Sequence, residues 1–495
     1  MKRTFLKVLH CNLCGGKIKE SYIFNTSELE IEWGTLKCTD CRNKFPIVFG
    51  IPIMMPPDNF VDIKRNKLFD NIRVKGPMVI ELTNLVETNQ IDKVERILLS
   101  PKLTRSTFYK KGIAIKPVTN KWAKRVIPGF VLKNIDIRYY YNNFKVLFAK
   151  LTFEDLRMHR QENRLFNNLK NANSAESFIK NYFQHIKINE LNHYFTYRFS
   201  EPRYITAISL ASIMPKSQKP ILDLGCGVGH ILHYLTTSRI QQECIGLDRD
   251  FEALLIAKKF VAPMGEFVFG NADMPLPFPD DSFSGVLCSD AFMFFAYKKL
   301  TINEIKRIIS KEGVITLSGI LNSEDSRNDY YEILEEKISP DELKKLFKGI
   351  KNMVVDSEMI QDRYFQKLGP CLSEEQRITQ LNRVKKLSLI ASKSDNVFCD
   401  HGLFDKWPHS YGNLQINPLY KQSGLDESGN YIYNFTFPSK WFEIENKDWL
   451  KYAPKTISLN PKLLETISNN EKSPVIEDLV NNFVVLGFPE NYLDN

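Results

Sequence analysis

The segment Leu222-Asp223-Leu224-Gly225-Cys226-Gly227-Val228-Gly229 runs from an apolar stretch directly into a glycine-rich turn. An apolar stretch of this kind, bounded by glycines, is typical of a buried strand. The residues from Val228 to Leu235 then open a helix. Because glycine has no Cβ, such a turn lets the backbone come close to a ligand. The segment therefore predicts a strand, a ligand-binding turn and a helix in succession.

The same alternation continues to about residue 320. Further strands are predicted at 243–248, 266–270, 283–289 and 314–318, helices at 251–260 and 302–309, and a turn at 311–313. Strands that alternate with helices indicate an α/β fold with a doubly wound, mostly parallel sheet. In such sheets nucleotides bind where the strands end.

Acidic residues accompany the glycine turn. Asp223 lies two residues before the first glycine, and Asp248 ends the next predicted strand, 19 residues after Gly229. A carboxylate at the second position accepts hydrogen bonds from ribose hydroxyls. The glycine spacing differs from the dinucleotide fingerprint G-x-G-x-x-G, and an acid beside the loop would repel phosphate. Together these residues predict a cationic nucleoside without phosphate as the ligand.

A second motif, Asp273-Met274-Pro275-Leu276-Pro277-Phe278-Pro279-Asp280-Asp281-Ser282-Phe283-Ser284, follows the third predicted strand. With the glycine segment it resembles the class I S-adenosylmethionine-dependent methyltransferases of the small-molecule type. Their motifs are D-x-G-C-G-x-G and D-x-x-x-L-P-F-x-D-x-S-F-D, and Ser284 replaces the last aspartate. The resemblance covers about residues 216–320 and implies S-adenosyl-L-methionine as the cofactor. The alternative is another nucleotide-binding domain, or a degenerate fold that no longer binds.

The resemblance also implies roles for single residues. Gly225, Gly227 and Gly229 would hold the methionine part of the cofactor, with Asp223 near its amino group. Asp248 would bind the ribose. The implied contacts to the adenine and to the rest of the cofactor are Asn271, Ala272, Asp273 and Ser289.

The sequence offers three candidates for a catalytic base. A base is needed only if the acceptor must lose a proton, because positioning supplies much of the rate of methyl transfer from an activated sulfonium. Asp290 follows the fourth predicted strand, where this family faces its substrate; a helix-capping role is the alternative. His401 and His409 could act as bases if their segment folds over the site, and otherwise they are structural.

Two C-x-x-C pairs, Cys11/Cys14 and Cys38/Cys41, lie near the N-terminus. Four thiolates in two such pairs suit tetrahedral zinc, and reduced or redox-active thiols are the alternative. With Phe45-Pro46-Ile47 and Gly50-Ile51-Pro52, residues 8–56 resemble the small zinc-ribbon proteins that bind and activate RNA and protein methyltransferases as separate subunits. We expect the fused ribbon to pack on its own methyltransferase core. A closed four-cysteine site leaves no open position, so the zinc would be structural.

Composition limits the class of protein. The chain has 495 residues, 43% hydrophobic and 25% charged, as is typical of a globular protein of two to four domains. No apolar run reaches the length of a membrane span, and the N-terminus has no hydrophobic stretch of the kind that a signal peptide needs. Nine cysteines, an odd number, argue against a disulfide framework. We therefore expect a cytoplasmic protein.

The expected domains are a zinc ribbon (1–57), a basic and mostly helical segment on the acceptor side (58–200), the methyltransferase core (201–370) and a C-terminal accessory domain (371–495). Residues 61–160 contain 21 Lys/Arg and 9 Asp/Glu, a net charge of +12, whereas the whole chain has +9. Such a segment could face RNA, anionic lipid or an acidic small molecule, or form a solvated surface.

The sequence favours an enzyme that methylates a small-molecule or biosynthetic acceptor. The first alternative is a methyltransferase of ribosomal or transfer RNA, which the basic segment and the ribbon's relatives suggest. The second is a cofactor-binding scaffold without catalysis that holds a partner enzyme.

Overall fold

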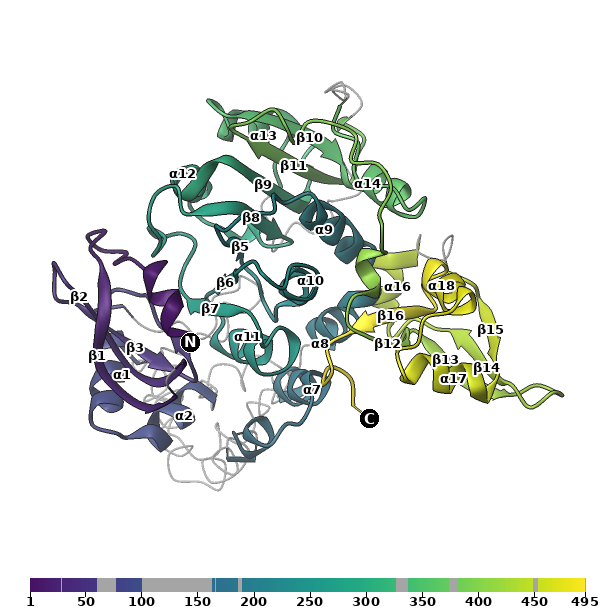
Figure 1. The fold of residues 1–495 in the computed structure, drawn as a ribbon, viewed down its shortest axis with the longest axis horizontal. Helices are drawn as coiled ribbons and strands as arrows, with labels where there is room; N and C mark the ends of the chain where they lie inside the picture. Colours follow the sequence, from purple (N-terminus) through teal and green to yellow (C-terminus); the bar gives the residue numbers. More distant parts are fainter. Residues whose placement is uncertain are drawn as a thin grey trace, which may run out of the picture.

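The computed structural model describes residues 1–27, 29–59, 77–99, 163–164, 166–185, 189–325, 337–373, 381–447 and 453–494. Figure 1 shows an N-terminal ribbon in purple, a central sheet in teal and green, and a C-terminal part in yellow. Most of the predicted basic segment 61–160 lies outside the described residues. In the part of the chain that is described, no helix has the length and apolar character needed to cross a membrane.

A seven-stranded sheet forms the centre, with the strand order β10-β11-β9-β8-β5-β6-β7. The strands are β5 (Ile221–Leu224), β6 (Cys244–Asp248), β7 (Glu266–Phe269), β8 (Phe283–Ser289), β9 (Ile309–Leu321), β10 (Lys351–Asp356) and β11 (Lys386–Ser392). The five from β5 to β9 pair in parallel, whereas β11 runs antiparallel to both β9 and β10. The predicted α/β fold with a mostly parallel sheet is confirmed.

Helices cover both faces of this sheet. One face carries α9 (Pro202–Ser212), α10 (His230–Ser238) and α11 (Phe251–Ile256), and the other carries α12 (Lys298–Ile308), α13 (Pro340–Leu346) and the ribbon. The residues of β5 are mostly apolar because this strand is covered on both faces. Ile221 packs with the first layer, whereas Leu222 and Leu224 pack with the second. A parallel strand buried on both faces needs apolar side chains on both.

Two boundaries differ from the prediction. Residues 309–313, predicted as a helix end and a turn, form the start of β9, and the register beside β8 shifts between Phe283 and Gly285 to accommodate them. The core also extends beyond residue 370, because β11 lies between β9 and β10 and the sheet is complete only with it.

The N-terminal ribbon is an antiparallel sheet of four strands in sequence order. Its elements are the short helix η1 (Arg3–Lys7) and the strands β1 (Ile18–Thr26), β2 (Ile31–Cys38), β3 (Lys44–Val48) and β4 (Ile51–Pro52). The helices α1 (Val79–Glu87) and α2 (Ile91–Leu99) follow, and Glu87 fastens α1 to the ribbon. Its carboxylate accepts hydrogen bonds from Thr35 Oγ1 at 3.0 Å and from Lys44 Nζ at 2.7 Å.

The ribbon packs on the sheet at β7, as expected. Ile53 forms a parallel bridge with Phe269, and the Met54 N–H donates to the Phe269 carbonyl at 2.9 Å. The His10 N–H donates to the Pro277 carbonyl at 2.9 Å. These contacts cover the outer edge of the last strand, which would otherwise present unpaired backbone groups.

The C-terminal part combines two small sheets with helices, and the sequence had left its fold open. One sheet pairs β12 with β16, and the other has the order β13-β14-β15. The elements are η8 (Pro408–Ser410), β12 (Asn413–Ile416), β13 (Tyr420–Leu425), β14 (Tyr431–Phe435), α16 (Lys440–Asn446), β15 (Thr456–Leu459), α17 (Pro461–Ser468), α18 (Pro474–Asn481) and β16 (Val485–Phe488). The η8 segment packs against α9 and α10, so this part adjoins the core directly.

Candidate functional site

The glycine turn connects β5 to α10. Gly225, Gly227 and Gly229 all have positive φ angles, of 76°, 52° and 85°. A Cβ on Gly225 would lie 2.5 Å from the Ala291 side chain, and one on Gly229 would lie 2.9 Å from Ala257. The backbone conformation and the close neighbours both require glycine here. The turn therefore leaves backbone rather than side chains at the end of β5.

Asp248, at the end of β6, braces this turn. Its Oδ2 accepts a hydrogen bond from the Gly227 N–H at 2.8 Å, and its Oδ1 accepts one from the Asp250 N–H at 2.9 Å. Burial raises the pKa of this carboxyl group, and the two backbone donors oppose that effect. The predicted ribose-binding carboxylate thus lies beside the predicted cofactor loop.

Asp223 lies inside β5 and is 1% exposed. Its Oδ2 has no hydrogen-bond partner among the residues that the structure describes. Burial and the nearby charge of Asp248 raise the pKa of Asp223 to about 7. A buried carboxylate oxygen without a donor is costly, and a ligand ammonium would satisfy it. This position fits the role predicted for Asp223, near the amino group of the cofactor.

The loop after β7 carries Asn271, Ala272 and Asp273. Asn271 Oδ1 accepts from the Asp273 N–H at 3.0 Å, and the Ala272 carbonyl accepts from Thr301 Oγ1 at 2.9 Å. Asp273 Oδ1 accepts from the Tyr297 N–H at 2.8 Å, which ties the loop to the start of α12. The predicted contact of these residues with adenine stays a prediction.

Ser289 and Asp290 follow β8 and meet an arginine from the segment before α9. Arg198, in η4 (Arg198–Ser200), donates to Asp290 Oδ2, and its Nη2 also lies 3.4 Å from Ser289 Oγ. Arg198 Nη1 pairs with Glu201 at 2.9 Å. Burial alone would raise the pKa of Asp290, but Arg198 and Arg203 outweigh it and hold the pKa below its usual value. Asp290 is therefore an ionised, ion-paired group and a weak base.

A larger group of buried charges surrounds this pair. Arg203 Nη2 lies 3.3 Å from Glu445 Oε2, and Lys386 Nζ lies 3.9 Å from the same oxygen. Both arginines lie over the ring of Tyr194, from α8 (Asn189–Thr196), at 4.9 Å and 5.7 Å from its centroid. The members, which we call the buried charge cluster, are Tyr194, Arg198, Glu201, Arg203, Asp290, Lys386 and Glu445.

Of this cluster, only Asp290 was predicted from the amino-acid sequence. Its members come from α8, η4, α9, β11, α16 and the loops beside them. The only local signal was Arg198 and Glu201 at a spacing of three residues, and such pairs are common on solvated helices. Several polar atoms of the cluster have no hydrogen-bond partner among the described residues: Glu201 Oε1, Arg203 Nε and Asp290 Oδ1.

The two candidate histidines lie outside this cluster. His409 is buried in the C-terminal part, with Nδ1 at 2.9 Å from the Tyr364 hydroxyl and Nε2 at 3.0 Å from the Val480 carbonyl. Burial lowers its pKa to about 3. His401 Nε2 lies 2.9 Å from the Val397 carbonyl. With both ring nitrogens of His409 occupied, the structure gives this residue a core position rather than that of a base.

Tyr492 supports the glycine turn through its contact with His230. The Tyr492 side chain is fully buried, and its hydroxyl lies 2.7 Å from Nε2 of His230, the residue that follows Gly229. The same nitrogen lies 3.1 Å from the Phe195 carbonyl, and the Phe195 ring lies against Gly227. The C-terminal part therefore helps to hold the helix that the glycine turn opens.

Gly319 in β9 makes room for Asp290. Its φ angle is +73°, and a Cβ there would lie 1.9 Å from Asp290 Oδ1. Gly349, with a φ angle of +90°, has nothing within 4 Å of a Cβ and is a matched control. Both substitutions place an alanine at a positive φ angle, so the backbone strain is common to the two variants. Only the Cβ at position 319 also collides with Asp290. We therefore expect Gly319→Ala to lower the free energy of unfolding by about 2 kcal/mol more than Gly349→Ala. Chemical denaturation checks this difference, and equal losses in the two variants would contradict the packing around Asp290.

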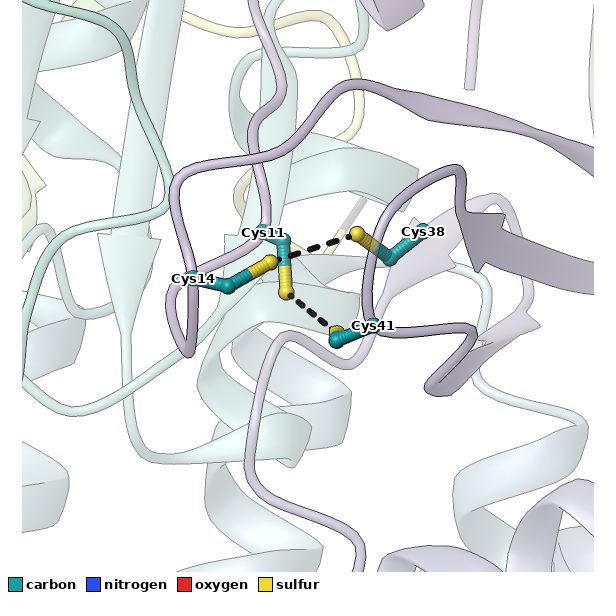
Figure 2. Close-up of side chains that lie close together, drawn as sticks. All are labelled: Cys11, Cys14, Cys38 and Cys41. Carbon is teal, nitrogen blue, oxygen red and sulfur yellow. Dashed lines mark hydrogen bonds between the residues drawn. The ribbon is translucent and has the colours of Figure 1, made fainter.

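The four N-terminal cysteines converge, as Figure 2 shows. Cys11 Sγ lies 3.6 Å from Cys41 Sγ, Cys14 Sγ lies 3.5 Å from Cys38 Sγ, and all four sulfur atoms lie within 4.8 Å of one another. Four sulfurs at about 2.3 Å from one metal lie at such separations.

Backbone and side-chain donors also approach the sulfurs. The Asp40 N–H lies 3.4 Å from Cys38 Sγ, and Asn43 Nδ2 lies 3.2 Å from Cys41 Sγ. Such donors stabilise thiolates and orient ligands. The donor set and its geometry therefore fit a structural zinc ion.

Known proteins resemble the central part of the chain. Residues 222–317 match the family model of a methyltransferase domain. The "Uncharacterized methyltransferase YcgJ" of Bacillus subtilis is 34% identical over 102 residues, which are 20% of this chain and 39% of YcgJ. The chain thus spans about two fifths of the length of this curated relative.

Many solved structures are also similar to the chain, and two of them serve as examples. The S-adenosylmethionine-dependent methyltransferase of Thermotoga maritima is 18% identical with a TM-score of 0.30, over 44% of this chain and all of that chain. The complex of the Haloferax volcanii Trm112 methyltransferase activator with a methyltransferase is 20% identical with a TM-score of 0.33, over 41% of this chain and 95% of that chain.

Proposed function

We propose that the chain, whose residues 222–317 form a methyltransferase domain, transfers a methyl group from S-adenosylmethionine to a small-molecule acceptor. The observation that carries the proposal is the pair of carboxylates at adjacent strands. Asp248 accepts a hydrogen bond from the Gly227 N–H. The buried Asp223 has one carboxylate oxygen without a hydrogen-bond partner among the described residues. When bound, the cofactor supplies a methyl group that its sulfonium already activates.

The residues present fit this cofactor. Asp223 binds its ammonium group, Asp248 its ribose hydroxyls, and the glycine turn its methionine part. Arg198, which lies beside Ser289 and lowers the pKa of Asp223 by its charge, is suited to the cofactor carboxylate. Asn271, Ala272 and Asp273 border the adenine.

Burial of the charge cluster supports a small acceptor. The side chains of Arg198, Glu201 and Asp290 are only 4%, 0% and 5% exposed. A small molecule can enter such a site, whereas a base within a nucleic acid must first leave its stack. RNA remains the second candidate, because residues 61–160 carry a net charge of +12 and such charge favours phosphate backbones.

The ribbon is proposed as a structural zinc module. A closed set of four thiolates offers no open coordination position, so the metal would hold the fold rather than act on the substrate. Its contacts with Phe269 and Pro277 flank the proposed adenine loop.

Cofactor binding is expected to release a proton near pH 7. Free Asp223 has a pKa raised to about 7 by burial, and a bound ammonium favours its ionised form and lowers that pKa. Calorimetric titration with S-adenosylhomocysteine at pH 6.5, in two buffers with different ionisation enthalpies, measures the released protons. We expect about half a proton or more per site for the wild-type chain, and a value close to zero for Asp223→Asn if it still binds. Buffer-independent heats in the wild type would contradict this role.

The experiment that tests the function combines binding with an acceptor screen. The wild-type chain is titrated with S-adenosylhomocysteine, and its zinc content is read on the same sample. The protein is then incubated with methyl-labelled S-adenosylmethionine and either a pool of small metabolites or total RNA. Label in the first pool supports the proposal, and label in RNA alone supports the second candidate. Binding without transfer to either pool would favour a scaffold, and a folded protein that does not bind would overturn the proposal.

A further inference from the structure

Lys386 is placed where an acceptor would bind. It is the first residue of β11, which runs antiparallel to β9 and pairs Lys386 with Leu321 at the end of that strand. The start of β11 therefore lies at the same edge of the sheet as the ends of β8 and β9. Asp290 follows β8 at this edge, and ligands of doubly wound sheets bind there.

The ammonium group of Lys386 is poorly partnered. Its nearest acidic oxygen is Glu445 Oε2, at 3.9 Å, and the side chain is only 14% exposed. Within the described ranges no hydrogen bond to its Nζ is found at 3.5 Å or less. Because this ion pair is long and the lysine is mostly buried, its charged form is weakly stabilised.

Charged groups face Lys386 from each neighbouring element. They are Arg203 of α9, Glu201 before α9, Asp290 after β8, Glu445 of α16 and the adjacent Lys385. Burial makes the largest contribution to the pKa of Lys386 and lowers it, and the charge of Arg203 lowers it further. The charges of Asp290 and Glu201 raise this pKa. Together these effects place the pKa of Lys386 at about 7. A large fraction of this amine is therefore neutral at physiological pH.

We propose that Lys386 is the general base that deprotonates a hydroxyl acceptor. The inference rests on the proposed function and deepens it. Asp290 is less suited to this task, because Arg198 and Arg203 hold it as an ion-paired carboxylate. It would instead position Arg198 and the acceptor.

The presence of a base indicates the class of acceptor. A neutral amine is nucleophilic without help and can lose its proton to water afterwards. A hydroxyl group is a poor nucleophile until its proton is removed, and a positioned base is then valuable. In the proposed step, the acceptor O–H proton passes to the lone pair of Lys386 Nζ. The oxygen forms its bond to the methyl carbon while the carbon–sulfur bond breaks, and that electron pair stays on sulfur. The products are a methyl ether, a neutral thioether and a Lys386 ammonium group.

The first test measures Lys386 without any acceptor. The full chain, saturated with S-adenosylhomocysteine, is pulsed with acetic anhydride from pH 5 to pH 10, and labelling of each lysine is followed by peptide mass spectrometry. We expect Lys386 to reach half of its maximal labelling rate near pH 7, about three pH units below the value of about 10.4 for a lysine in a model peptide. A labelling rate of Lys386 that is still rising at pH 10 would overturn the proposal.

The second test uses methyl transfer to two hydroxyl probes, catechol and 4-hydroxybenzoate, beside amine and thiol probes of similar size. Lys386→Met removes the base, and Lys386→Arg keeps a positive charge that cannot be lost near neutral pH. Lys393→Met, at the opposite end of β11, is the matched control. We expect both Lys386 variants to lower kcat on a hydroxyl probe at least about 100-fold. They should also lose the rise of kcat with pH that we expect for the wild type around pH 7.

The readouts separate this inference from the proposed function. Both Lys386 variants are expected to bind S-adenosylhomocysteine within about twofold of the wild type, which also shows that they are folded. Full activity of Lys386→Met, or methylation of amine or thiol probes alone, would overturn the role of Lys386 and leave the methyltransferase standing. Loss of S-adenosylhomocysteine binding in the wild type would overturn the proposed function itself. If no probe is methylated, the labelling experiment decides. Half-maximal labelling of Lys386 near pH 7 then supports its proposed role, and an ordinary lysine profile overturns it.

Discussion

The Asp248→Ala chain is expected to bind S-adenosylhomocysteine at least about 100-fold more weakly than the wild type. In the structure this carboxylate accepts hydrogen bonds from the Gly227 and Asp250 N–H groups. The variant loses the proposed contacts to the ribose hydroxyls and also the brace of the glycine turn. Hydrogen bonds to a charged group are each worth about 1.5–3 kcal/mol, and about 2.8 kcal/mol corresponds to a 100-fold change in affinity.

Calorimetric titration measures this effect, with Asp280→Ala as the control. Asp280 belongs to the same proposed domain, but its side chain is exposed and pairs with Arg307 on the surface. We expect the control to bind within about twofold of the wild type. An Asp248→Ala chain that is folded and binds within threefold of the wild type would remove the main argument for the cofactor site.

Loss of zinc is expected to destabilise the whole protein and to weaken cofactor binding. In Cys38→Ser, one of the four converging sulfurs is gone and the ribbon loses its crosslink. Structural zinc sites contribute roughly 10–16 kcal/mol in isolated modules, so we expect the ribbon to unfold. The midpoint of thermal unfolding should fall by about 5 °C or more.

The effect on the cofactor site follows from two contacts of the ribbon. Met54 holds the Phe269 carbonyl at the start of the proposed adenine loop, and His10 holds the Pro277 carbonyl near its end. With both released, we expect the dissociation constant for S-adenosylhomocysteine to rise about tenfold. Cys399→Ser replaces an exposed cysteine outside the cluster and is the control. A Cys38→Ser chain that retains one zinc ion and its thermal midpoint would contradict the stabilising role proposed for the four-cysteine site.

Several features of the fold were predictable because their signals are local. The turn between β5 and α10 could be predicted from its three glycines. Glycine is favoured there because the three positions have positive φ angles. Asp248 was predictable from its distance along the chain, since one helix and one strand separate it from the turn. The two C-x-x-C pairs were also predictable, because the two cysteines of each pair lie in one short turn.

Other features escaped prediction because they depend on contacts between distant elements. The place of β11 in the sheet requires an antiparallel pairing with β9, and neither strand shows it in its own residues. His409 was predicted as a base on the condition that its segment folds over the site, with a structural role as the alternative. Its packing against Phe483, with a ring centroid distance of 4.0 Å, shows instead a buried core residue.

The type of the central sheet, the glycine turn with Asp223 and Asp248, and the four cysteines of the ribbon could all be predicted from the amino-acid sequence alone. These features rest on backbone geometry and on spacings of a few residues to one helix length, so the local chain already contains them. Only the tertiary structure brought Arg198, Arg203, Asp290, Lys386 and Glu445 together and placed the ribbon on β7. In the sequence these charges look like solvated surface residues. Their effect on one another depends on distance and burial, and both arise only when strands and helices far apart in the chain pack together.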